Sequence, residues 1–400
     1  MRYVIAGNGA TAVMAADALV KEEPGSTIEI YGDESYLAYR RPQIPAFLAG
    51  EVELERMLMH SQAWYDERGI AVHRDAHVEA LDPGAGQIHL AGGEKVPYDR
   101  LLLAVGSRSF VPPIMGTDQP GVFTLRTVED AMAIREYAQN RRRAVVIGGG
   151  LLGLEAARSL RALGLEVTVL EVYGWLLPRQ LDRPGAEILT GIIEGMGIHV
   201  LTGAALECVS EKECVSGVRL KDGRGLEAEV VLISTGVRCR LELAREAGLE
   251  VNRGVVVDGH LRSSAEGIYA AGDVAEFEGR VYGILPAVWD QAPIAAANMA
   301  GREAVYTGTI PSTTLKVVGL DLTSVGEVNP EGEAFEELRR SEPEAARYVK
   351  VVLRDGRLVG AILLGDRRRV RMFKGLIDKE ADVSTYAERL LDADFTEVPQ

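Results

Sequence analysis

The stretch RAVVIGGGLLGLEAARSLRALGLEVTVLE, residues 143–171, decides the fold of this chain. Its apolar start predicts a buried strand, and an amphipathic helix follows a turn that fits the pattern G-x-G-x-x-G. The glycines of that pattern are Gly148, Gly150 and Gly153. In such a unit the N–H groups at the helix start face a pyrophosphate, and the glycines let the backbone approach it closely. The stretch therefore predicts a dinucleotide-binding module.

An acidic residue indicates which dinucleotide this module takes. Glu171 ends the second strand of the stretch, roughly 20 residues beyond the turn, where a carboxylate can accept hydrogen bonds from both ribose hydroxyls. Val172 and Tyr173 follow it, so a 2′-phosphate would lack an arginine partner there. The pattern favours NADH over NADPH. The alternative for Glu171 is a solvated acid at the end of a strand.

A second copy of the same plan opens the chain. Residues 2–6 predict a strand, a helix follows through Val20, and residues 27–31 predict the next strand. The turn residues that fit the fingerprint are Gly7, Gly9 and Ala12. Alanine is tolerated in the third position because only a small residue is needed there for packing of helix on strand. The acidic partner of this module is Asp33 or Glu34.

Each module is predicted to close with a strand that ends in glycine. Residues 101–105 lead into Gly106, and residues 229–233 lead to Gly236. Residues 268–273 add a short apolar strand that ends in a Gly-Asp turn. The repeat therefore includes the closing strand of each module.

The C-terminal part of the chain has a different pattern. Residues 291–304 predict a long Ala-rich helix, and from Pro311 onward strands such as residues 348–353 alternate with hairpin signals such as Asp355-Gly356. This alternation indicates a small α+β unit. The predicted fold class is α/β, with two Rossmann-like dinucleotide-binding domains and a small α+β C-terminal domain.

Length and composition exclude several function classes. The 400 residues favour two or three packed domains, and 47% hydrophobic with 26% charged residues is typical of a folded globular protein. A net charge of -15 argues against nucleic-acid binding. Without a signal peptide or an apolar run of roughly 18 residues, the sequence predicts a cytoplasmic protein with no membrane span. Cys208, Cys214 and Cys239 form no CxxC pair, so neither a disulfide scaffold nor a metal site is expected.

The two modules together resemble the FAD- and NAD-dependent reductases of the pyridine nucleotide-disulfide oxidoreductase family, which have a glutathione-reductase-like fold. The likeness covers nearly the whole chain. It is closest to the cysteine-free branch, which includes NADH:rubredoxin reductases, the flavin-binding part of assimilatory nitrite reductases and oxygenase-type ferredoxin reductases. The segments that carry it are residues 39–42, 101–106, 125–127, 150–155 and 269–273, with residues 314–319 and 323–326 similar to the third domain of rubredoxin and nitrite reductases.

This resemblance implies cofactors and domains. FAD and NAD(H) are the expected cofactors. The FAD-binding domain is expected to be discontinuous, with residues 1–112 and 243–310. Residues 113–242 would form the NAD-binding domain and residues 311–400 a C-terminal interface domain.

The resemblance also implies contacts to FAD. It puts the pyrophosphate on Gly7 and Gly9, the ribose on Glu34, the adenine on the backbone of Val78, and the ribityl chain on Asp273. An aspartate after a glycine suits that last role because it could accept hydrogen bonds from ribityl hydroxyls while capping the next helix. By itself the Gly-Asp pair would be an ordinary turn.

Further cofactor contacts are expected from the same resemblance. Arg41 would neutralise pyrophosphate charge, although Arg41 and Pro42 could instead fix the backbone of their own loop. Arg126 could contact the cofactor or form a surface ion pair. The remaining expected contacts are Ala12, Ala104, Gly106, Leu285, Gly148, Gly150, Leu152, Gly153, Glu171 and Gly236.

Glu155 is the expected catalytic residue. In relatives this position lies at the start of the helix that faces the nicotinamide, where a carboxylate can hold the carboxamide near the flavin. The alternative is burial of Glu155 against Arg158 or Arg161. Residues 36–46 depart from the disulfide reductases and related NADH oxidases because they contain no cysteine, and Pro45-Ala46 stands where ferredoxin-reductase relatives often carry Ser-Lys.

The function expected from these features is oxidation of NADH by an FAD-dependent reductase that passes electrons to a protein electron carrier. The carrier would be rubredoxin, ferredoxin or an iron-sulfur partner subunit. One alternative is an NADH oxidase acting on oxygen or peroxide, which the missing cysteine argues against. Another is a flavin-bound regulatory protein that responds to NADH.

A basic segment is the expected docking surface for the carrier. An acidic redox protein would be steered toward it on a chain that is otherwise acidic. Its residues are Arg367, Arg368, Arg369 and Arg371. The alternative is a solvated helix whose apolar side, with Val370, Phe373 and Ile377, packs on the third domain.

Overall fold

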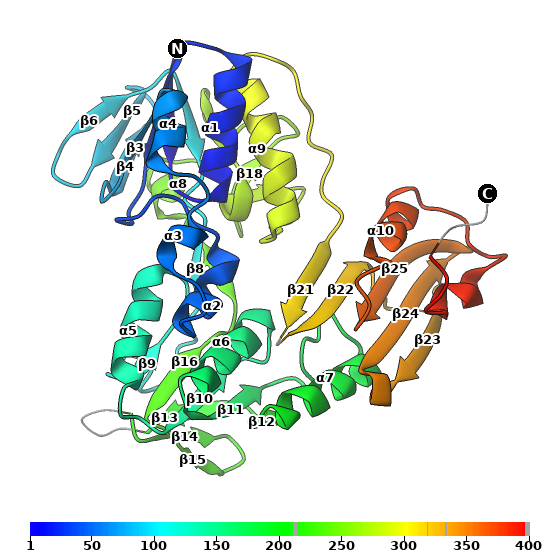
Figure 1. Ribbon diagram of the computed structural model, residues 1–400. Coiled ribbons are helices and arrows are strands. Elements are labelled where there is room, and N and C mark those ends of the chain that lie inside the picture. Colours follow the sequence, from blue (N-terminus) through cyan, green and yellow to red (C-terminus); the bar gives the residue numbers. More distant parts are fainter. Residues whose placement is uncertain (211–214, 318, 333, 397–400) are drawn as a thin grey trace. The chain divides into compact units, whose positions relative to one another are not determined.

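The computed structural model describes residues 1–210, 215–317, 319–332 and 334–396, apart from the side chains of residues 313–317 (Figure 1). Cys214 lies outside this description. The chain forms two compact units. Unit 1 consists of Met1–Gln43, Glu53–Arg108 and Val237–Thr309, and unit 2 consists of Ile44–Val52, Ser109–Gly236 and Ile310–Gln400.

A parallel sheet forms the core of unit 1, with its strands in the order β19-β7-β1-β2-β3. The strands are β1 (Arg2–Ala6), β2 (Thr27–Tyr31), β3 (Ile70–His73), β7 (Arg100–Leu103) and β19 (Ile268–Ala270). The central β1 is fully buried from Tyr3 to Ala6, and Ile5 pairs with Ile30 on one side and Leu102 on the other. Continuous apolar strands of this kind are typical of parallel sheets. The four strands expected in this part of the chain are confirmed.

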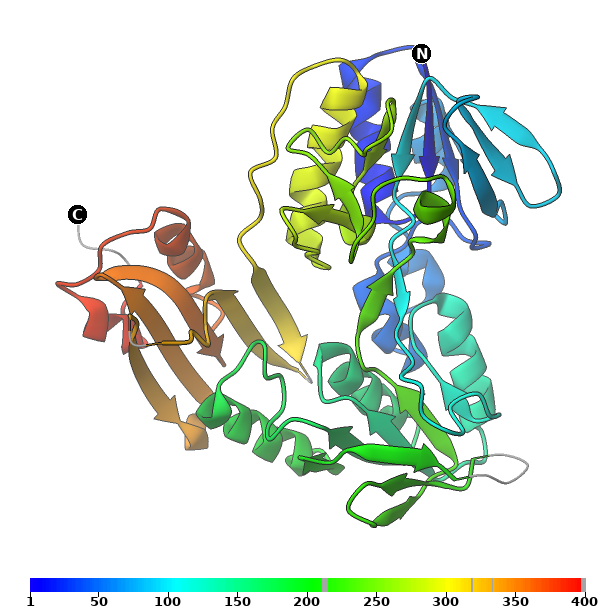
Figure 2. The same ribbon diagram turned by 180° about the vertical axis from the view of Figure 1, so that it is seen from behind.

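Two long helices, α1 (Ala10–Glu22) and α9 (Leu285–Met299), pack beside each other in unit 1 (Figures 1 and 2). The helix expected over residues 291–304 is wrong in its bounds, because α9 begins and ends earlier. Pro286 suits the first turn, where its missing N–H is not needed. Gly301, with a φ of 78°, follows the end of the helix.

Shorter elements complete unit 1. They include a three-stranded antiparallel sheet, β4-β5-β6, and two two-stranded sheets, β17-β8 and β18-β20. The elements that belong wholly or partly to this unit are η1 (Arg41–Gln43), α3 (Leu54–Met57), α4 (Gln62–Glu67), β4 (Val78–Asp82), β5 (Gln87–Leu90), β6 (Lys95–Pro97), β8 (Ser107–Ser109), β17 (Val237–Cys239), α8 (Glu242–Glu246), β18 (Val255–Val257), η2 (Gly272–Val274) and β20 (Ala275–Phe277).

Unit 2 contains a second parallel sheet, in the order β12-β11-β10-β16-β9. Thr127 caps α5 with a reciprocal pair of hydrogen bonds to Asp130, and Asp182 caps α7. The strands and helices of this part are α2 (Ile44–Leu48), β9 (Val122–Phe123), α5 (Val128–Ala138), β10 (Arg143–Ile147), α6 (Leu151–Ala162), β11 (Glu166–Glu171), α7 (Arg183–Gly195), β12 (Ile198–Thr202), β13 (Leu206–Val209), β14 (Gly217–Leu220), β15 (Gly225–Glu227) and β16 (Val230–Ile233).

The C-terminal part of unit 2 is an antiparallel sheet in the order β21-β22-β25-β24-β23. Its elements are β21 (Ser312–Val317), β22 (Leu320–Gly326), β23 (Glu336–Glu342), η3 (Pro343–Ala345), β24 (Arg347–Arg354), β25 (Arg357–Leu364), α10 (Val370–Asp378) and η4 (Ala387–Leu391). The hairpin expected at Asp355-Gly356 is confirmed, since both residues have the positive φ angles of a two-residue turn. The apolar side of α10, with Phe373 and Ile377, is buried on this sheet.

Within unit 2 a buried polar joint connects the C-terminal sheet to α7. The hydroxyl of Tyr348 donates to the Asp182 carboxylate at 2.6 Å, and the ammonium of Lys350 lies 3.1 Å from Glu337 and 3.5 Å from Asp182. A Cβ on Gly185 would lie 2.9 Å from the Tyr348 ring. Glycine on α7 therefore lets the sheet approach the helix closely.

The helix α2 belongs to unit 2 although its sequence interrupts the segments of unit 1. The hydroxyl of Ser159 on α6 donates to the Pro45 carbonyl at 2.6 Å, and Arg135 on α5 donates to the Phe47 carbonyl. These bonds hold residues 44–52 on the helices of the second module. The compact units therefore group the chain differently from the three expected domains, which stay a prediction.

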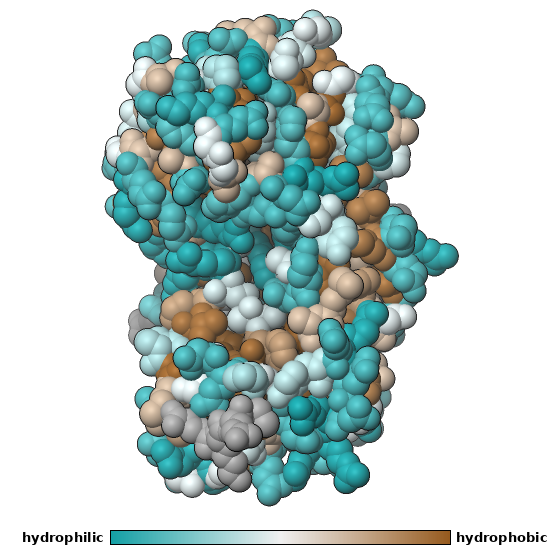
Figure 3. Space-filling view, turned by 90° about the vertical axis from the view of Figure 1, so that its left-hand side faces the viewer, coloured by the Kyte–Doolittle hydropathy of each residue, from teal (hydrophilic) through white to brown (hydrophobic). Residues whose placement is uncertain are grey.

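The face in Figure 3 is covered mainly by hydrophilic side chains, with hydrophobic side chains gathered in a few patches. No helix in the described ranges is long and apolar enough to cross a membrane. Large apolar side chains that remain exposed include Leu152, Val172, Tyr173, Leu285 and Trp289. Leu152 and Leu285 are themselves expected cofactor contacts, and Val172 directly follows Glu171.

Candidate functional site

The first candidate site lies where the strand order of unit 1 reverses. The chain continues from β1 to β2 on one side and reaches β7 on the other, and ligands of such sheets bind outside the carboxyl ends at this point. Gly7 follows β1 with a φ of 112°, and a Cβ there would lie 2.2 Å from the carbonyl oxygen of Ala104. Close approach of the two strand ends thus requires glycine at this position.

Gly9 has no such structural reason to be glycine. Its φ is -119°, an angle that any residue adopts, and no protein atom lies within 4 Å of the place that a Cβ would occupy. Gly9 is also the N-cap of α1, where no side chain accepts a hydrogen bond from the first N–H groups of the helix. Open space beside uncapped N–H groups fits a pyrophosphate, which those groups would bind.

Asp273 is held close to the start of α1. The preceding Gly272 has a φ of 78°, and a Cβ there would lie only 2.2 Å from the hydroxyl oxygen of Thr11. The N–H of Gly272 donates to the buried Gln291 side chain at 2.7 Å, and the carboxylate of Asp273 accepts from the Ser107 hydroxyl at 2.8 Å. Ala12 is fully buried in the same helix turn. The Gly-Asp turn is therefore fixed against the first module.

Glu34 and Arg41 form an ion pair in this unit. Tyr39 donates to the Glu34 carboxylate and accepts from Arg41 at 3.2 Å. Burial alone would lower the pKa of the Arg41 guanidinium. Tyr39, Glu34 and Asp273 outweigh burial and raise that pKa. A permanently charged group thus lies among the residues expected to contact the pyrophosphate and ribose.

The structure distinguishes the two acidic candidates after β2. Asp33 is largely exposed and pairs with His77 at 2.9 Å and Arg240 at 2.7 Å, whereas Glu34 faces Arg41. The exposed pairs of Asp33 are ordinary surface contacts. Glu34 is the better placed of the two for a ligand.

The remaining expected residues of unit 1 lie at several strand and helix ends. Val78 begins β4 and is buried, and Leu285 is the exposed first residue of α9. Gly106 follows β7 with a φ of 71° and open space at its virtual Cβ. Pro42 is exposed within η1.

The second candidate site repeats this design at the point where β10 separates β11 from β16. A Cβ on Gly148 would lie 2.2 Å from the Ser234 carbonyl oxygen, and one on Gly153 would lie 2.0 Å from the Gly148 carbonyl oxygen. Gly150 has a φ of -78° and no atom within 4 Å of its virtual Cβ. As in unit 1, the middle glycine is the one that protein packing does not explain.

Glu171 is buried, with 5% of its surface exposed, so the alternative of a solvated strand-end acid is wrong. One carboxylate oxygen accepts from the N–H of Gly149 at 2.7 Å, and the other accepts from the N–H of Tyr173 at 2.9 Å. Both bonds orient the carboxylate at the glycine turn. Three apolar side chains beside this turn are exposed: Leu152 at 45%, Val172 at 60% and Tyr173 at 61%.

Glu155 lies on α6, one turn beyond the glycine turn, and is partly exposed. The Nε atom of Arg158 lies 3.6 Å from its carboxylate, while both terminal nitrogens of Arg158 lie 2.7 Å from the carboxylate of Glu51. Arg161 instead donates to the Leu165 carbonyl at 3.5 Å. Of the two expected neighbours of Glu155, the structure places Arg158 beside it.

Gly236 and Arg126 are further expected cofactor contacts in unit 2. Gly236 follows β16 with a φ of 107° and open space at its virtual Cβ. Arg126 precedes α5, and its backbone N–H donates to the Asp130 carboxylate at 2.7 Å. The structure therefore does not bring Arg126 and Gly7 into the same compact unit.

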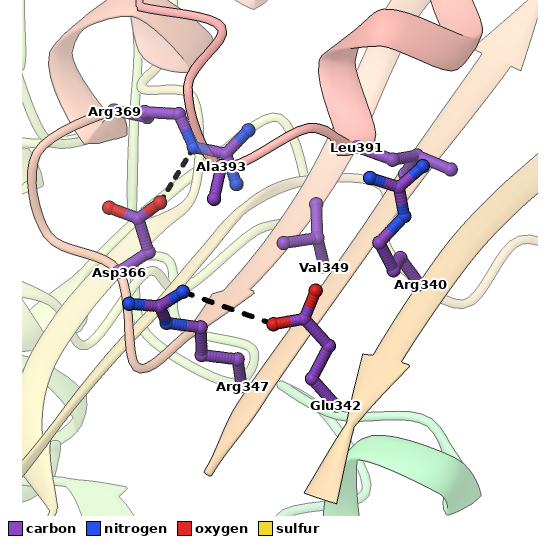
Figure 4. Close-up of a pocket in the computed structure, with 8 residues that line it drawn as sticks. All are labelled: Arg340, Glu342, Arg347, Val349, Asp366, Arg369, Leu391 and Ala393. Carbon is purple, nitrogen blue, oxygen red and sulfur yellow. Dashed lines mark hydrogen bonds and ion pairs between the residues drawn. The ribbon is translucent and has the colours of Figure 1, made fainter. Parts of the chain in front are cut away.

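The expected docking role of Arg369 is wrong, because this arginine is only 1% exposed. Its Nε atom pairs with Asp366 at 2.7 Å, and a terminal nitrogen donates to the carbonyls of Leu390 and Asp392, each at 2.8 Å. Figure 4 shows the pair with Asp366 beside a small cavity. The run of five arginine and valine residues, 367–371, does not reveal in the sequence which arginine side chain faces inward.

The other three arginines of the basic segment are exposed. They are Arg367, Arg368 and Arg371. The expected packing of the apolar side of α10 is confirmed for Phe373 and Ile377, whereas docking of a carrier at the exposed arginines stays a prediction.

The described cysteines are not arranged for thiol chemistry or metal binding. Cys208 is buried and Cys239 is half-buried, and both are free thiols. Over the described ranges no group of three or more His, Cys, Asp or Glu side chains could hold a metal ion. No sequence motif points to Ser107, Gln291 or Cys239, whose contacts around Asp273 join segments far apart in the chain.

The chain belongs to the pyridine nucleotide-disulphide oxidoreductase family, whose description matches residues 1–304. Residues 311–381 match the rubredoxin NAD+ reductase C-terminal domain. The expected resemblance and fold class are confirmed. FAD and NADH are confirmed as cofactors at the level of the family, as is the expectation of an oxidoreductase.

Named relatives give a finer comparison. The assimilatory nitrate reductase electron transfer subunit of Bacillus subtilis (strain 168) is 33% identical over 98% of this chain and 51% of its own length. The NADH-rubredoxin oxidoreductase of Clostridium acetobutylicum is 28% identical, with 94% of each chain covered. A solved NAD-dependent persulfide reductase from A. fulgidus has a TM-score of 0.90 at 26% identity, over 97% of this chain and 78% of that one. The chain spans about half the length or less of the first curated relatives it matches.

Proposed function

We propose that this chain is an FAD-dependent reductase that takes hydride from NADH and passes electrons to a protein electron carrier. The observation that carries the proposal is the pair of glycine turns of one design. Packing requires glycine at Gly7 in the first turn and at Gly148 and Gly153 in the second. The middle glycine of each turn, Gly9 or Gly150, instead leaves open space beside helix N–H groups that no side chain caps. Two dinucleotides can therefore bind to one chain.

The turn at Gly7 is proposed to hold FAD. Gly9 would admit the pyrophosphate, Arg41 would neutralise its charge, and Glu34 would accept from the adenosine ribose. Asp273 would accept hydrogen bonds from the ribityl chain. FAD, when bound, supplies an acceptor for two electrons that can release them singly.

Further contacts to FAD are proposed from neighbouring elements. Val78 would meet the adenine through its backbone, and Arg126 would reach the cofactor from the segment before α5. The remaining proposed contacts are Ala12, Pro42, Ala104, Gly106 and Leu285.

The turn at Gly148 is proposed to hold NADH. Glu171 would accept from the ribose hydroxyls, because its two backbone bonds already orient the carboxylate and leave lone pairs for further donors. The negative charge of Glu171 would repel a 2′-phosphate, and burial keeps water from screening that repulsion. Exposed Val172 and Tyr173 would cover the adenosine, and the other proposed contacts are Gly150, Leu152, Gly153 and Gly236.

Glu155 is proposed to orient the nicotinamide. A carboxylate accepts hydrogen bonds from the carboxamide N–H₂ group, and this fixes which ring face is presented. The Nε atom of Arg158 lies 3.6 Å from the Glu155 carboxylate and places a positive charge beside it. Orientation, rather than acid or base chemistry, is the role of this side chain.

The proposed domains follow from these assignments. Residues 1–112 and 243–310 would form the FAD-binding domain, residues 113–242 the NAD-binding domain, and residues 311–400 an interface domain. The segment 44–52 is the exception within the first range, since it packs with unit 2. A cytoplasmic location is proposed because NADH is the electron donor.

The proposed partner is an acidic electron carrier such as rubredoxin, ferredoxin or an iron-sulfur subunit. The names of the relatives, an electron transfer subunit and an NADH-rubredoxin oxidoreductase, support this class of partner. Exposed Arg367, Arg368 and Arg371 would steer an acidic carrier, whereas buried Arg369 would not take part.

A second candidate function is oxidation of NADH by oxygen or peroxide. A relative named NADH oxidase from Methanocaldococcus jannaschii is 31% identical over all of this chain and 95% of its own length. Against this reading, residues 36–46 contain no cysteine that could take part in electron transfer. A regulatory protein that only binds flavin and NADH is the third candidate.

Anaerobic stopped-flow absorbance tests the proposed function. The purified protein is mixed with NADH or with NADPH, and rubredoxin or ferredoxin is then added to the reduced form. Rapid bleaching by NADH, followed by reoxidation on adding a carrier, is the expected result. Reoxidation by oxygen at a comparable rate would favour the oxidase, and flavin that neither nucleotide reduces would favour the regulatory protein.

A further inference from the structure

We propose that Ser107 and Cys239 are positioning residues that hold Asp273 in place for FAD. They lie on β8 and β17, two strands by which the chain passes between its compact units. This inference rests on the proposed function, in which Asp273 contacts the ribityl chain. It adds two side chains from outside the nucleotide-binding motifs to the flavin site.

Ser107 acts on the carboxylate itself. Its hydroxyl donates to Oδ2 of Asp273 at 2.8 Å, and its side chain is buried. A hydroxyl bonded to an ionised carboxylate forms a stronger bond than one between neutral groups, and burial protects that bond from competing water. Ser107 therefore selects one orientation of the carboxylate.

Cys239 acts on the backbone of the same residue. Its thiol donates to the carbonyl oxygen of Asp273 at 3.1 Å. Burial, followed by the charge of Asp273, raises the pKa of this thiol and keeps it in the S–H form that can donate. A thiol is a weak donor, so its contribution is smaller than that of Ser107.

The turn has separate support on its other side. Gly272 packs against Thr11 and donates to Gln291, and these contacts hold the backbone whether or not Ser107 is present. Loss of the Ser107 hydroxyl would therefore remove one hydrogen bond that orients the carboxylate without unfolding the turn. The effect of Ser107 on FAD binding can therefore be measured separately from its effect on folding.

Ser107 and Cys239 lie next to the two points at which the chain passes between its compact units. The chain leaves unit 1 after Arg108, directly beyond Ser107, and returns at Val237, two residues before Cys239. The strands β8 and β17 pair with each other. Both crossing strands therefore carry a hydrogen bond to one aspartate, and FAD bound to that aspartate would help to order them.

The test is the affinity of the apoprotein for FAD, measured by quenching of flavin fluorescence, with the visible circular dichroism of the bound flavin as a signature of its setting. Ser107→Ala should weaken FAD binding by about tenfold or more and change the dichroism, as expected for loss of a hydrogen bond to a charged group. Ser107→Thr keeps the hydroxyl and should restore both. Cys239→Ala should weaken binding by a few fold, and Cys239→Ser should not.

Ser109→Ala is the matched control, because it removes the same hydroxyl from the same strand two residues away. Thermal unfolding of each apoprotein shows whether the variant folds, and Ser107→Cys provides the same comparison should the alanine variant not fold. FAD affinity and dichroism of Ser107→Ala equal to those of the unaltered protein would overturn the inference.

Asp273→Asn separates the inference from the proposed function. If it binds FAD as tightly as the unaltered protein, the role of Asp273 fails and the inference fails with it. If Asp273→Asn weakens FAD binding and Ser107→Ala does not, only the positioning role is wrong. If the unaltered protein takes up no FAD, the proposed function itself is wrong.

Discussion

Both terminal nitrogens of Arg158 lie 2.7 Å from the two carboxylate oxygens of Glu51. This bidentate pair fixes the plane of the guanidinium, and its remaining Nε atom lies 3.6 Å from Glu155. One arginine thus ties the segment after α2 to α6 and places a positive charge beside the residue proposed to orient the nicotinamide.

Arg158→Gln is expected to impair use of NADH but not retention of FAD. Glu155 would lose its cationic neighbour and its fixed orientation, so KM for NADH should rise by about three- to tenfold. Steady-state kinetics and flavin absorbance measure the two properties. Arg161→Gln, on the next turn of the same helix, is the control. An unchanged KM in Arg158→Gln would show that the arginine only tethers α2.

The same pair predicts a dependence of stability on pH. The hydrogen bond from Arg158 holds the pKa of Glu51 below its usual value. Because the folded-state pKa is lowered, the pair stabilises the fold above the unfolded value of about 4.3 and loses this effect as pH falls through the folded value. The difference in melting temperature between the unaltered protein and Glu51→Gln should shrink between pH 6 and pH 3. A difference that is constant over this range would contradict the assignment.

The glycines of the first turn predict opposite effects of one substitution. Gly9→Ala places its methyl group in open space at an allowed φ, so the apoprotein should melt at an unchanged temperature but bind FAD at least about tenfold more weakly. Gly7→Ala meets the Ala104 carbonyl at 2.2 Å at a φ of 112°, and it should destabilise the apoprotein itself. Calorimetry and FAD titration distinguish the two. Tight FAD binding by Gly9→Ala would show that the pyrophosphate does not bind at this turn.

Glu171→Gln is expected to reduce the preference for NADH. The amide can still accept one backbone hydrogen bond, but it loses the charge that repels a 2′-phosphate and one acceptor oxygen for the ribose. KM for NADH should rise by about tenfold or more, while KM for NADPH stays constant or falls. Comparison of kcat/KM for the two nucleotides measures this. An equal loss of kcat/KM with NADH and with NADPH would show that Glu171 only stabilises the fold of the turn.

Adjacent arginines predict separate roles in stability and partner binding. Arg369→Ala removes the buried ion-pair partner of Asp366, which among the described residues keeps only its contacts with Arg368, and should destabilise the protein by about 3–5 kcal/mol. Arg368→Glu breaks only a 3.9 Å ion pair with Asp366, so it should destabilise the protein much less than Arg369→Ala. It should slow reduction of an acidic carrier at low salt, with dye reduction by NADH unaffected. A carrier rate that does not respond to Arg368→Glu or to salt would exclude this surface from docking.

The periodic parts of the fold could be predicted from the sequence, and the contacts between distant segments could not. The strands β1 and β10 follow from uninterrupted apolar runs next to glycine turns, because parallel strands are covered on both faces. The strands β2 and β11 contain the polar residues Glu29 and Thr168, and they follow from the repeated order of strand, turn, helix and strand. Nothing in the run from Arg367 to Arg371 indicates that only Arg369 turns inward. The buried pairing of that arginine depends on carbonyls of η4, which arrive later in the chain.

The candidate site shows the same division. Gly9, Gly150 and Glu171 could be identified because a dinucleotide turn imposes spacing along one segment. Ser107 and Cys239 could not, because their contacts with Asp273 bridge separate segments and neither residue belongs to a motif. The only local signal was the position of Ser107 directly after Gly106.

The packing of residues 44–52 on α5 and α6 limits how this protein can be recombined with its relatives. A chimera that exchanges only residues 113–242 would set a foreign α6 against the native α2, and the bonds from Ser159 to Pro45 and from Arg158 to Glu51 would then depend on a chance match. Exchange of the second nucleotide module should succeed only when this short stretch travels with it. The two nucleotide modules therefore cannot be exchanged independently, because the second module packs on α2, which lies far in sequence from both ends of residues 113–242.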